Sequence, residues 1–142
     1  MSIEIRRLLP GDDVLLDHVA EEVFDSPIDP GRLAAYLAAA DHLMIVALSD
    51  RLVVGQCAAV IHRHPDKPTE LYIDEVGVSP AFQRQGIARS MLEAMFALGR
   101  QHGCEEAWVG TEPDNAGARA LYENLPEDTV PADGFVMYSY RL

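Results

Sequence analysis

Apolar and polar residues alternate along the chain in patterns that predict short strands and helices. Residues 3–9 predict an edge strand, and residues 16–23 repeat apolar side chains at the i, i+3, i+4 and i+7 positions of an amphipathic helix. Proline and glycine interrupt the chain within 27–31, and the Ala- and Leu-rich stretch 32–40 predicts a second short helix.

The middle of the chain predicts three strands. Two runs rich in apolar and β-branched residues, 42–48 and 52–62, are separated by the polar residues 49–51, a spacing typical of an antiparallel hairpin. A third such run, 70–78, ends at Ser79-Pro80, so it predicts a central strand that is stopped by a turn.

A long helix and three shorter elements follow. Residues 84–102 contain no proline and repeat apolar side chains with helical spacing, and Gly103 stands where a helix C-cap glycine belongs. We expect a strand, a helix and a final strand at residues 107–110, 115–125 and 135–140. This order predicts one α/β domain over residues 1–142, with a mixed sheet whose parallel neighbours are joined by a right-handed crossover.

Composition and charge narrow the function classes. With 23 acidic and 11 basic residues, the 142-residue chain has a formal net charge of -12, which repels the phosphate backbone of nucleic acids. Its apolar run 43–48 is far too short to cross a bilayer, and no signal peptide is visible. We therefore expect a cytoplasmic protein that binds neither nucleic acid nor membrane.

Acidic side chains are concentrated near the N-terminus. They form either a solvated helix face or one wall of a site for a polycationic substrate. These residues are Asp12, Asp13, Asp17, Glu21, Glu22, Asp25 and Asp29.

The cysteines and histidines do not predict a metal centre. Cys57 and Cys104 stand apart without CxxC spacing, so we expect buried, reduced structural thiols. His62 and His64 share one face of a strand, but two ligands followed by Pro65 make a weak metal site. We interpret both histidines as surface residues and expect no metal.

The strongest chemical signal lies at residues 76–89, where a strand runs through a tight turn into a helix. Small residues at Gly86 and Ala88 let the backbone approach a ligand, and the free N–H groups of a first helical turn bind a pyrophosphate. Arg84 and Arg89 add positive charge. The segment lacks the Gly-Lys-Ser/Thr of a P-loop and the three glycines of a Rossmann turn. The alternative is that Gly86 only permits close packing of the helix.

Two blocks in this order resemble the GNAT superfamily of N-acetyltransferases. Gln83-Arg84-Gln85-Gly86-Ile87-Ala88 is similar to the Gln/Arg-x-x-Gly-x-Gly/Ala signature, and residues 115–122 resemble the Asn-x-x-Ala-x-x-Leu-Tyr pattern. Residues 70–88 look most like the aminoglycoside 3-N-acetyltransferase branch. One departure is that 125–127, Leu-Pro-Glu, replaces the usual Leu-Gly-Phe-like turn, with Gly134-Phe135 following later.

The resemblance implies the fold and the coenzyme site. The fold is an α/β arrangement with a mixed, mostly antiparallel sheet of about six to seven strands and about four helices, splayed at the central parallel strands. Acetyl-CoA is the implied co-substrate, with its pantetheine arm pairing like an added strand and its pyrophosphate on the helix N-terminus. The residues implied for coenzyme binding are Val76, Gly77, Val78, Gln83, Arg84, Gln85, Gly86, Ile87, Ala88, Arg89, Asn115, Ala118 and Tyr122.

Three residues are candidates for catalysis. The resemblance implies that Tyr122 faces the thioester sulfur, where its phenol can donate to the departing thiolate; its alternative role is core packing. An alkyl ammonium with a pKa of about 10.4 must lose a proton before it attacks, so a base is required. Asp74 and Glu75 are the candidates, because both lie on the strand that the resemblance assigns to the coenzyme. In a regular strand the two acids point to opposite faces, so only one serves unless a bulge intervenes. Asn115 has the alternative role of a helix N-cap.

These features predict an acetyl-CoA-dependent N-acetyltransferase that acts on the primary amine of a small cationic acceptor of the aminoglycoside or polyamine type. The amine attacks directly, because neither cysteine matches a nucleophile position. The alternatives are a protein or peptide N-acetyltransferase and a non-catalytic acyl-CoA-binding regulatory domain. Residues 135–140 are a candidate interface strand, so a homodimer is a further hypothesis.

Overall fold

The computed structural model describes residues 2–129, 131 and 134–142. The chain forms two compact units, Met1–Gly110 and Thr111–Leu142. The first unit contains the sheet, and the second contains the helix α3 (Ala116–Glu123). That both units make up a single domain stays a prediction.

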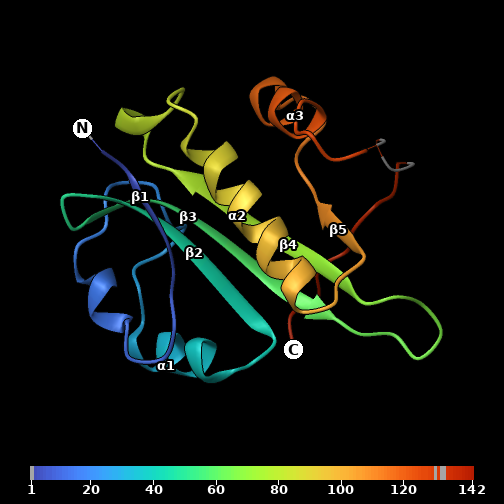
Figure 1. Ribbon diagram of the computed structural model, residues 1–142, viewed down its shortest axis with the longest axis horizontal. Coiled ribbons are helices and arrows are strands. Elements are labelled where there is room, and N and C mark those ends of the chain that lie inside the picture. Colours follow the sequence, from blue (N-terminus) through green and yellow to red (C-terminus); the bar gives the residue numbers. More distant parts are fainter. Residues whose placement is uncertain (1, 130, 132–133) are drawn as a thin grey trace. The chain divides into compact units, whose positions relative to one another are not determined.

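The first unit is built on a five-stranded sheet with the strand order β1-β2-β3-β4-β5 (Figure 1). The strands are β1 (Glu4–Arg7), β2 (His42–Ser49), β3 (Leu52–His62), β4 (Glu70–Val78) and β5 (Glu106–Val109). The helices are the 3-10 helices η1 (Asp13–Asp17) and η2 (Pro80–Phe82) and the α-helices α1 (Pro30–Ala38) and α2 (Ile87–Gln101). The first four strands pair antiparallel, and β4 pairs with β5 in parallel after the crossover through α2.

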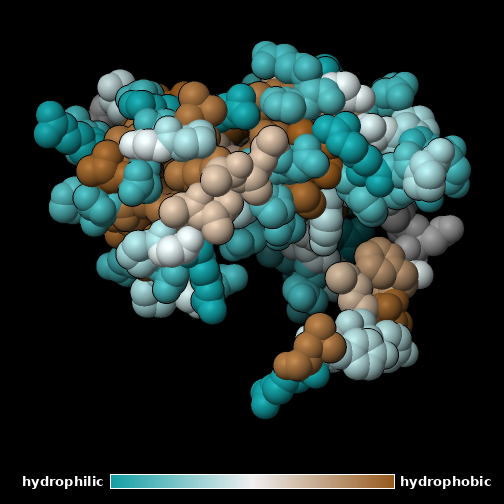
Figure 2. Space-filling view, turned by 90° about the horizontal axis from the view of Figure 1, so that it is seen from below, coloured by the Kyte–Doolittle hydropathy of each residue, from teal (hydrophilic) through white to brown (hydrophobic). Residues whose placement is uncertain are grey.

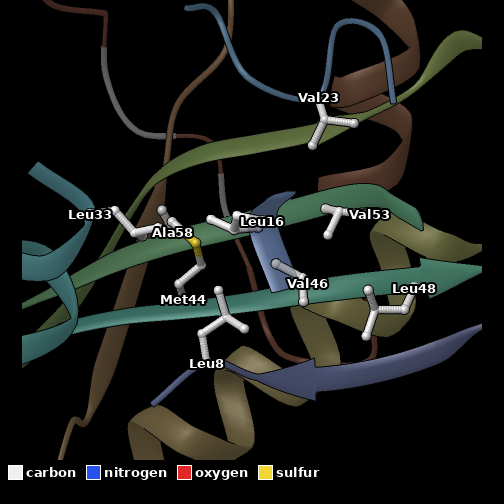
Figure 3. Packing of buried hydrophobic residues seen from close by; sticks show 9 residues of the cluster. All are labelled: Leu8, Leu16, Val23, Leu33, Met44, Val46, Leu48, Val53 and Ala58. Carbon is white, nitrogen blue, oxygen red and sulfur yellow. The ribbon is translucent and has the colours of Figure 1, made fainter. Parts of the chain in front are cut away.

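Helices cover both faces of this sheet. On one face α2 packs so closely that a Cβ at Gly99 would lie 2.8 Å from Leu71 Cδ2, and a Cβ at Gly55 would lie 3.0 Å from Met91 Cε. The other face carries η1, α1 and a cluster of buried apolar side chains (Figure 3). The cluster consists of Leu8, Leu16, Val23, Leu33, Met44, Val46, Leu48, Val53 and Ala58.

The hairpin between β2 and β3 turns more tightly than the sequence predicts. Ser49 pairs with Leu52, which leaves a connection of only Asp50 and Arg51. Both residues have positive φ, 48° and 69°, as the central residues of a type I′ turn do. The predicted antiparallel pairing is confirmed, and the strand bounds of β3 and β4 agree with the prediction.

The predicted helix within 16–23 is wrong, because the backbone of this segment forms hydrogen bonds with β3. The amide of Val53 donates to His18 O at 2.9 Å, and the amide of Ala20 donates to Val53 O at 2.8 Å. These two bonds hold the backbone extended and leave only the short η1 before it. Similarly, α2 begins at Ile87 rather than at 84, because Arg84 and Gly86 have left-handed backbones with φ of 62° and 78°.

The predicted strand at 135–140 is absent. A strand needs a partner for its backbone groups, and the described part of the second unit contains no other strand. The apolar side chains of this run are exposed, with 74% of Phe135 and 79% of Tyr140 accessible. The described structure therefore has five strands and three α-helices instead of about six to seven strands and four helices.

The surface carries both hydrophilic and hydrophobic residues. Figure 2 shows hydrophilic residues over much of one face, with hydrophobic residues gathered between them. Among the described residues, no helix is long and apolar enough to span a membrane.

Candidate functional site

A β-bulge in β4 brings the two candidate carboxylates together. Glu75 pairs with Ala58 and Ile73 pairs with Ala59, so Asp74 has no partner on β3. Ile73 is buried whereas Asp74 and Glu75 are both exposed, which interrupts the alternation of a regular strand. The extra residue turns both acids toward the face that carries η1 and α1. The bulge that the sequence left open is therefore present.

Glu75 lies in an acidic environment. Burial raises the pKa of its carboxyl group, and the charges of Asp74 and Asp25 raise that pKa further, while a hydrogen bond with the Gln56 side chain lowers it. Gln56 is buried, and its Nε2 also donates to Val23 O at 3.3 Å. Glu75 therefore interacts with the segment between η1 and α1 in two ways. The charge of Asp25 acts on it directly, and the Gln56 side chain forms hydrogen bonds with both Glu75 and Val23 O.

Asp74 lies beside an aromatic pair. Burial raises the pKa of its carboxyl group, and the charge of His42 lowers it in part. The His42 ring stacks on Tyr36 with centroids 5.0 Å apart. The Tyr36 hydroxyl donates to Leu43 O at 2.7 Å and lies 3.4 Å from Ala59 O, and burial together with the charge of Asp74 raises its pKa. Tyr36 therefore stays a neutral phenol, fixed by the sheet backbone.

Both cysteines are free thiols; Cys57 is buried, as the sequence predicts, whereas Cys104 is only half-buried. Burial and the charge of Asp74 raise the pKa of Cys57 to about 12, and burial also raises the pKa of Cys104. A thiol that keeps its proton at neutral pH is a poor nucleophile. This agrees with direct attack by the acceptor rather than a covalent enzyme intermediate.

The turn before α2 presents backbone N–H groups. The first hydrogen bond of the helix runs from Ser90 N to Gly86 O at 3.0 Å, so the amides before Ser90 precede the helical ladder. Gly86 is exposed, and no atom lies within 4 Å of the position that a Cβ would occupy there. Arg84 is exposed, whereas the Arg89 guanidinium pairs with Glu93 at 3.0 Å.

The edge of β4 is open along its second half. β5 pairs only with residues 70–73 of β4, so among the described residues β4 has no paired strand on that side from Asp74 to Val78. Gln83 Nε2 donates to Val78 O at 3.2 Å, which satisfies one of the groups expected to meet the pantetheine arm. An open strand edge can add an amide-containing chain.

Two of the predicted coenzyme residues have packing roles in the structure. A Cβ at Gly77 would lie 2.5 Å from Val23 O, so only glycine lets the two backbones approach there. Ile87 is buried in the core beneath α2. A small depression of about 90 Å³ lies at the start of α2, lined by Ile3, Ile5, Gln85, Gly86, Ile87 and Ser90.

The remaining predicted residues belong to the second unit. Asn115 Oδ1 accepts from Ala118 N at 3.0 Å, which confirms its alternative role as the N-cap of α3. Tyr122 is half-buried on the same helix. The roles of Asn115, Ala118 and Tyr122 toward the coenzyme stay predictions.

Three residues of the site, Gln56, Tyr36 and His42, were not predicted from the sequence. Gln56 could have been found, since it is the only amide within an otherwise apolar strand run. Tyr36 and His42 belong to no motif. Asp25 was one of the acids offered either as a solvated face or as a wall of a cationic site. A shallow cleft of about 290 Å³ includes Asp25, and its other lining residues are Val19, Ala20, Phe24, Ser26, Pro27 and Ile28.

Comparisons with known proteins show which family the chain resembles. The model of the Acetyltransferase (GNAT) family matches residues 13–125. Aminoglycoside N(6')-acetyltransferase type 1 of Salmonella typhimurium is 28% identical over 92 residues, which is 61% of this chain and 63% of that enzyme. The [Ribosomal protein bS18]-alanine N-acetyltransferase of Escherichia coli K12 is 36% identical over 62 residues, 40% of this chain and 42% of that enzyme.

A solved structure resembles the whole chain. It is that of AAC(6')-Iy in complex with the bisubstrate analog CoA-S-monomethyl-acetylneamine, with a TM-score of 0.79 and 20% identity, covering 100% of both chains. This likeness concerns the fold. Because the family model spans most of the sequence, including both signature blocks, the chain belongs to the GNAT family of acetyltransferases.

Proposed function

We propose that this chain is an acetyl-CoA-dependent N-acetyltransferase that acetylates a primary amine of a small polycationic acceptor. The observation that carries the proposal is the bulge, which turns Asp74 and Glu75 to the same face of the sheet. Two adjacent carboxylates, both with a pKa raised by burial, suit a site that must hold an ammonium group and then remove its proton.

The coenzyme fits the turn and the open edge of β4. The amides that precede Ser90 and the exposed Arg84 supply donors for a pyrophosphate. The unpaired edge from Asp74 to Val78 suits the amides of the pantetheine arm, with Gln83 leaving Val78 O when the arm pairs there. The thioester then lies at the bulge, next to the carboxylates.

The reaction follows from this arrangement. The acceptor arrives as an ammonium and gives one proton to Asp74 or Glu75, directly or through water. Its free amine attacks the thioester carbonyl, so an N–C bond forms and the C–S bond breaks. The phenol of Tyr122 is the proposed proton donor to the departing thiolate, and the proton that the attacking nitrogen loses as the amide forms restores this phenol, directly or through water. Binding both substrates side by side supplies much of the rate enhancement.

A polycation suits the acceptor side better than a neutral amine. Asp25 is close enough to raise the pKa of Glu75, and it also lines the cleft between η1 and α1. Three carboxylates that repel one another gain most from a ligand with several ammonium groups. Aminoglycosides have this chemistry, and the Salmonella typhimurium relative is named for them.

The position of the acetylated amine is a separate question. The aminoglycoside relative is named for the 6' amine, whereas residues 70–88 resemble the 3-N branch. The 3-N assignment therefore stays a prediction, and NMR of the acetylated product identifies the modified nitrogen.

A protein N-terminus is the second candidate acceptor. The similarity to a ribosomal-protein alanine N-acetyltransferase, at 36% identity over 62 residues, favours it. A basic peptide also suits the acidic site, so an assay with both acceptor classes is required to separate them.

The test is release of free thiol from acetyl-CoA by the purified chain in the presence of aminoglycosides, polyamines and basic peptides. We expect aminoglycosides to give the highest kcat/KM, and we expect Tyr122→Phe to lower kcat while CoA binding is retained; Tyr140→Phe, an exposed tyrosine, is the matched control. CoA binding without turnover on any acceptor would favour the regulatory-domain alternative. Absence of CoA binding would overturn the proposal.

The homodimer also stays a proposal. The apolar side chains of 135–140 are exposed in the described chain and suit burial against a second copy. Light scattering at micromolar concentration tests this, and a monomeric mass would contradict it.

A further inference from the structure

We propose that His62, His64 and Glu70 form a binding site for a divalent transition metal of the zinc type. The site lies at the end of the hairpin formed by β3 and β4. Each residue offers one ligand atom, and the three atoms all lie within 4.8 Å of one another. The two imidazoles were visible in the sequence, but the third ligand comes from the opposite strand.

Strand register brings the ligands together. His62, the last residue of β3, pairs directly with Glu70, the first residue of β4. His64 follows two positions later, and its ring centroid lies 4.3 Å from that of His62 with the planes tilted by 37°. Residues 63–69 connect the paired residues His62 and Glu70 and include His64, so a bound metal would hold the two ends of this loop together.

The contact between His64 and Glu70 has the spacing of two ligands of one ion. His64 Nε2 lies 3.2 Å from Glu70 Oε2. In a tetrahedral zinc site with ligands at about 2.0 Å, neighbouring ligand atoms lie about 3.3 Å apart. The Nε2 atom is enclosed, yet it has no aligned hydrogen-bond partner among the described residues. A shared cation satisfies both the imidazole lone pair and the carboxylate.

Burial and donor type favour zinc over harder ions. The side chains of His64 and Glu70 are only 15% and 16% exposed, whereas His62 is exposed and leaves a route for the ion and a water ligand. Two imidazoles and one carboxylate suit zinc and its neighbours better than Mg²⁺ or Ca²⁺, which prefer oxygen ligands.

This site is separate from the proposed acetyl-transfer site. Glu70 precedes Asp74 by four residues on β4, a separation of about 13 Å along an extended strand. The proposed role is therefore a structural clamp on the hairpin and not a part of the transfer reaction.

The test uses the full chain, freed of metal with a chelator and then titrated with Zn²⁺ by calorimetry and with Co²⁺ by visible absorption. We expect one equivalent of either ion to bind, and Zn²⁺ to raise the melting temperature, since it binds the folded state. His64→Gln and Glu70→Gln should each weaken binding by more than about tenfold, since loss of even an indirect partner of a metal ligand costs about that much.

Two control variants keep the test specific. His18→Gln removes an exposed histidine outside the cluster, and Cys104→Ser removes a half-buried thiol that is a possible rival ligand. Both should bind Zn²⁺ like the unchanged chain. The proposal is overturned if the unchanged chain binds neither ion, if the His64 and Glu70 variants bind normally, or if Cys104→Ser abolishes binding. In those cases His64 and Glu70 form only an ion pair.

Discussion

Asp74 and Glu75 face the same side of the β-sheet although they are adjacent in the sequence. The register with β3 skips Asp74, so the next residue repeats the direction of its side chain. A bulge of this kind re-aims side chains and also opens the strand edge beyond it. In this chain the bulge therefore positions both the proposed proton acceptor and the strand edge where we propose that the coenzyme pairs.

The first prediction concerns the base. We expect kcat/KM to rise with pH through the raised pKa of the essential carboxyl group, because only its ionised form accepts a proton. Replacing the base, by Asp74→Asn or Glu75→Gln, should lower kcat by roughly 10²–10⁴-fold and remove this acidic limb of the pH profile. If both variants keep the full rate and the same profile, the proton leaves by another route.

The second prediction concerns Asp25. We expect Asp25→Asn to raise KM for a polycationic acceptor with little change in kcat, because Asp25 lines the cleft and acts on Glu75 only through its charge. The same change should lower the pKa of Glu75 and move the acidic limb of the rate profile to lower pH. Asp13→Asn, on η1, is the matched control. An equal rise in KM for both variants would point to a general charge effect rather than a specific contact.

The third prediction compares two glycines at the ends of α2. Gly86 and Gly103 have similar left-handed backbones, φ 78° and 82°, and neither has an atom within 4 Å of the position that a Cβ would occupy. Replacement by alanine should therefore cost about 1–2 kcal/mol of stability at either place. Only Gly86→Ala should also weaken CoA binding in calorimetry, because it alone adjoins the free amides. Equal CoA affinity in both variants would contradict the proposed pyrophosphate site.

The fourth prediction concerns stability and pH at Asp74. Its pKa is raised in the folded state, so the folded chain holds this proton to higher pH than the unfolded chain does. Ionisation therefore costs stability as the pH rises from the unfolded pKa, about 3.9, through the folded pKa. We expect Asp74→Asn to have a higher melting temperature than the unchanged chain near neutral pH, and this gain should vanish in acid. A gain that is the same at all pH values would have another cause.

The sequence predicts the elements that consist of continuous runs of apolar residues. The apolar runs that became β2, β3 and β4 could be located because their residues are buried by the sheet itself. The helix expected within 16–23 failed because its backbone bonds to Val53, a long-range contact that no local periodicity reveals. The candidate acids were found by motif, but their shared direction depends on the register between β3 and β4. Tyr36 and His42 escaped for the same reason, because they reach Asp74 only through the fold.

The last prediction concerns the close approach of β4 to the segment before α1. A Cβ at Gly77 would lie 2.5 Å from Val23 O, and a backbone atom cannot move aside as a flexible side chain does. Gly77→Ala should therefore destabilise the chain by about 1–3 kcal/mol in chemical unfolding, because the segment must shift. The shift would also break the hydrogen bond from Gln56 to Val23 and so disturb the partner of Glu75. Gly110→Ala, with no atom within 4 Å of its Cβ position, should be nearly neutral. If Gly77→Ala were equally neutral, the two backbones would not be in contact. That result would contradict the proposed link from the carboxylate pair through Gln56 to the segment before α1.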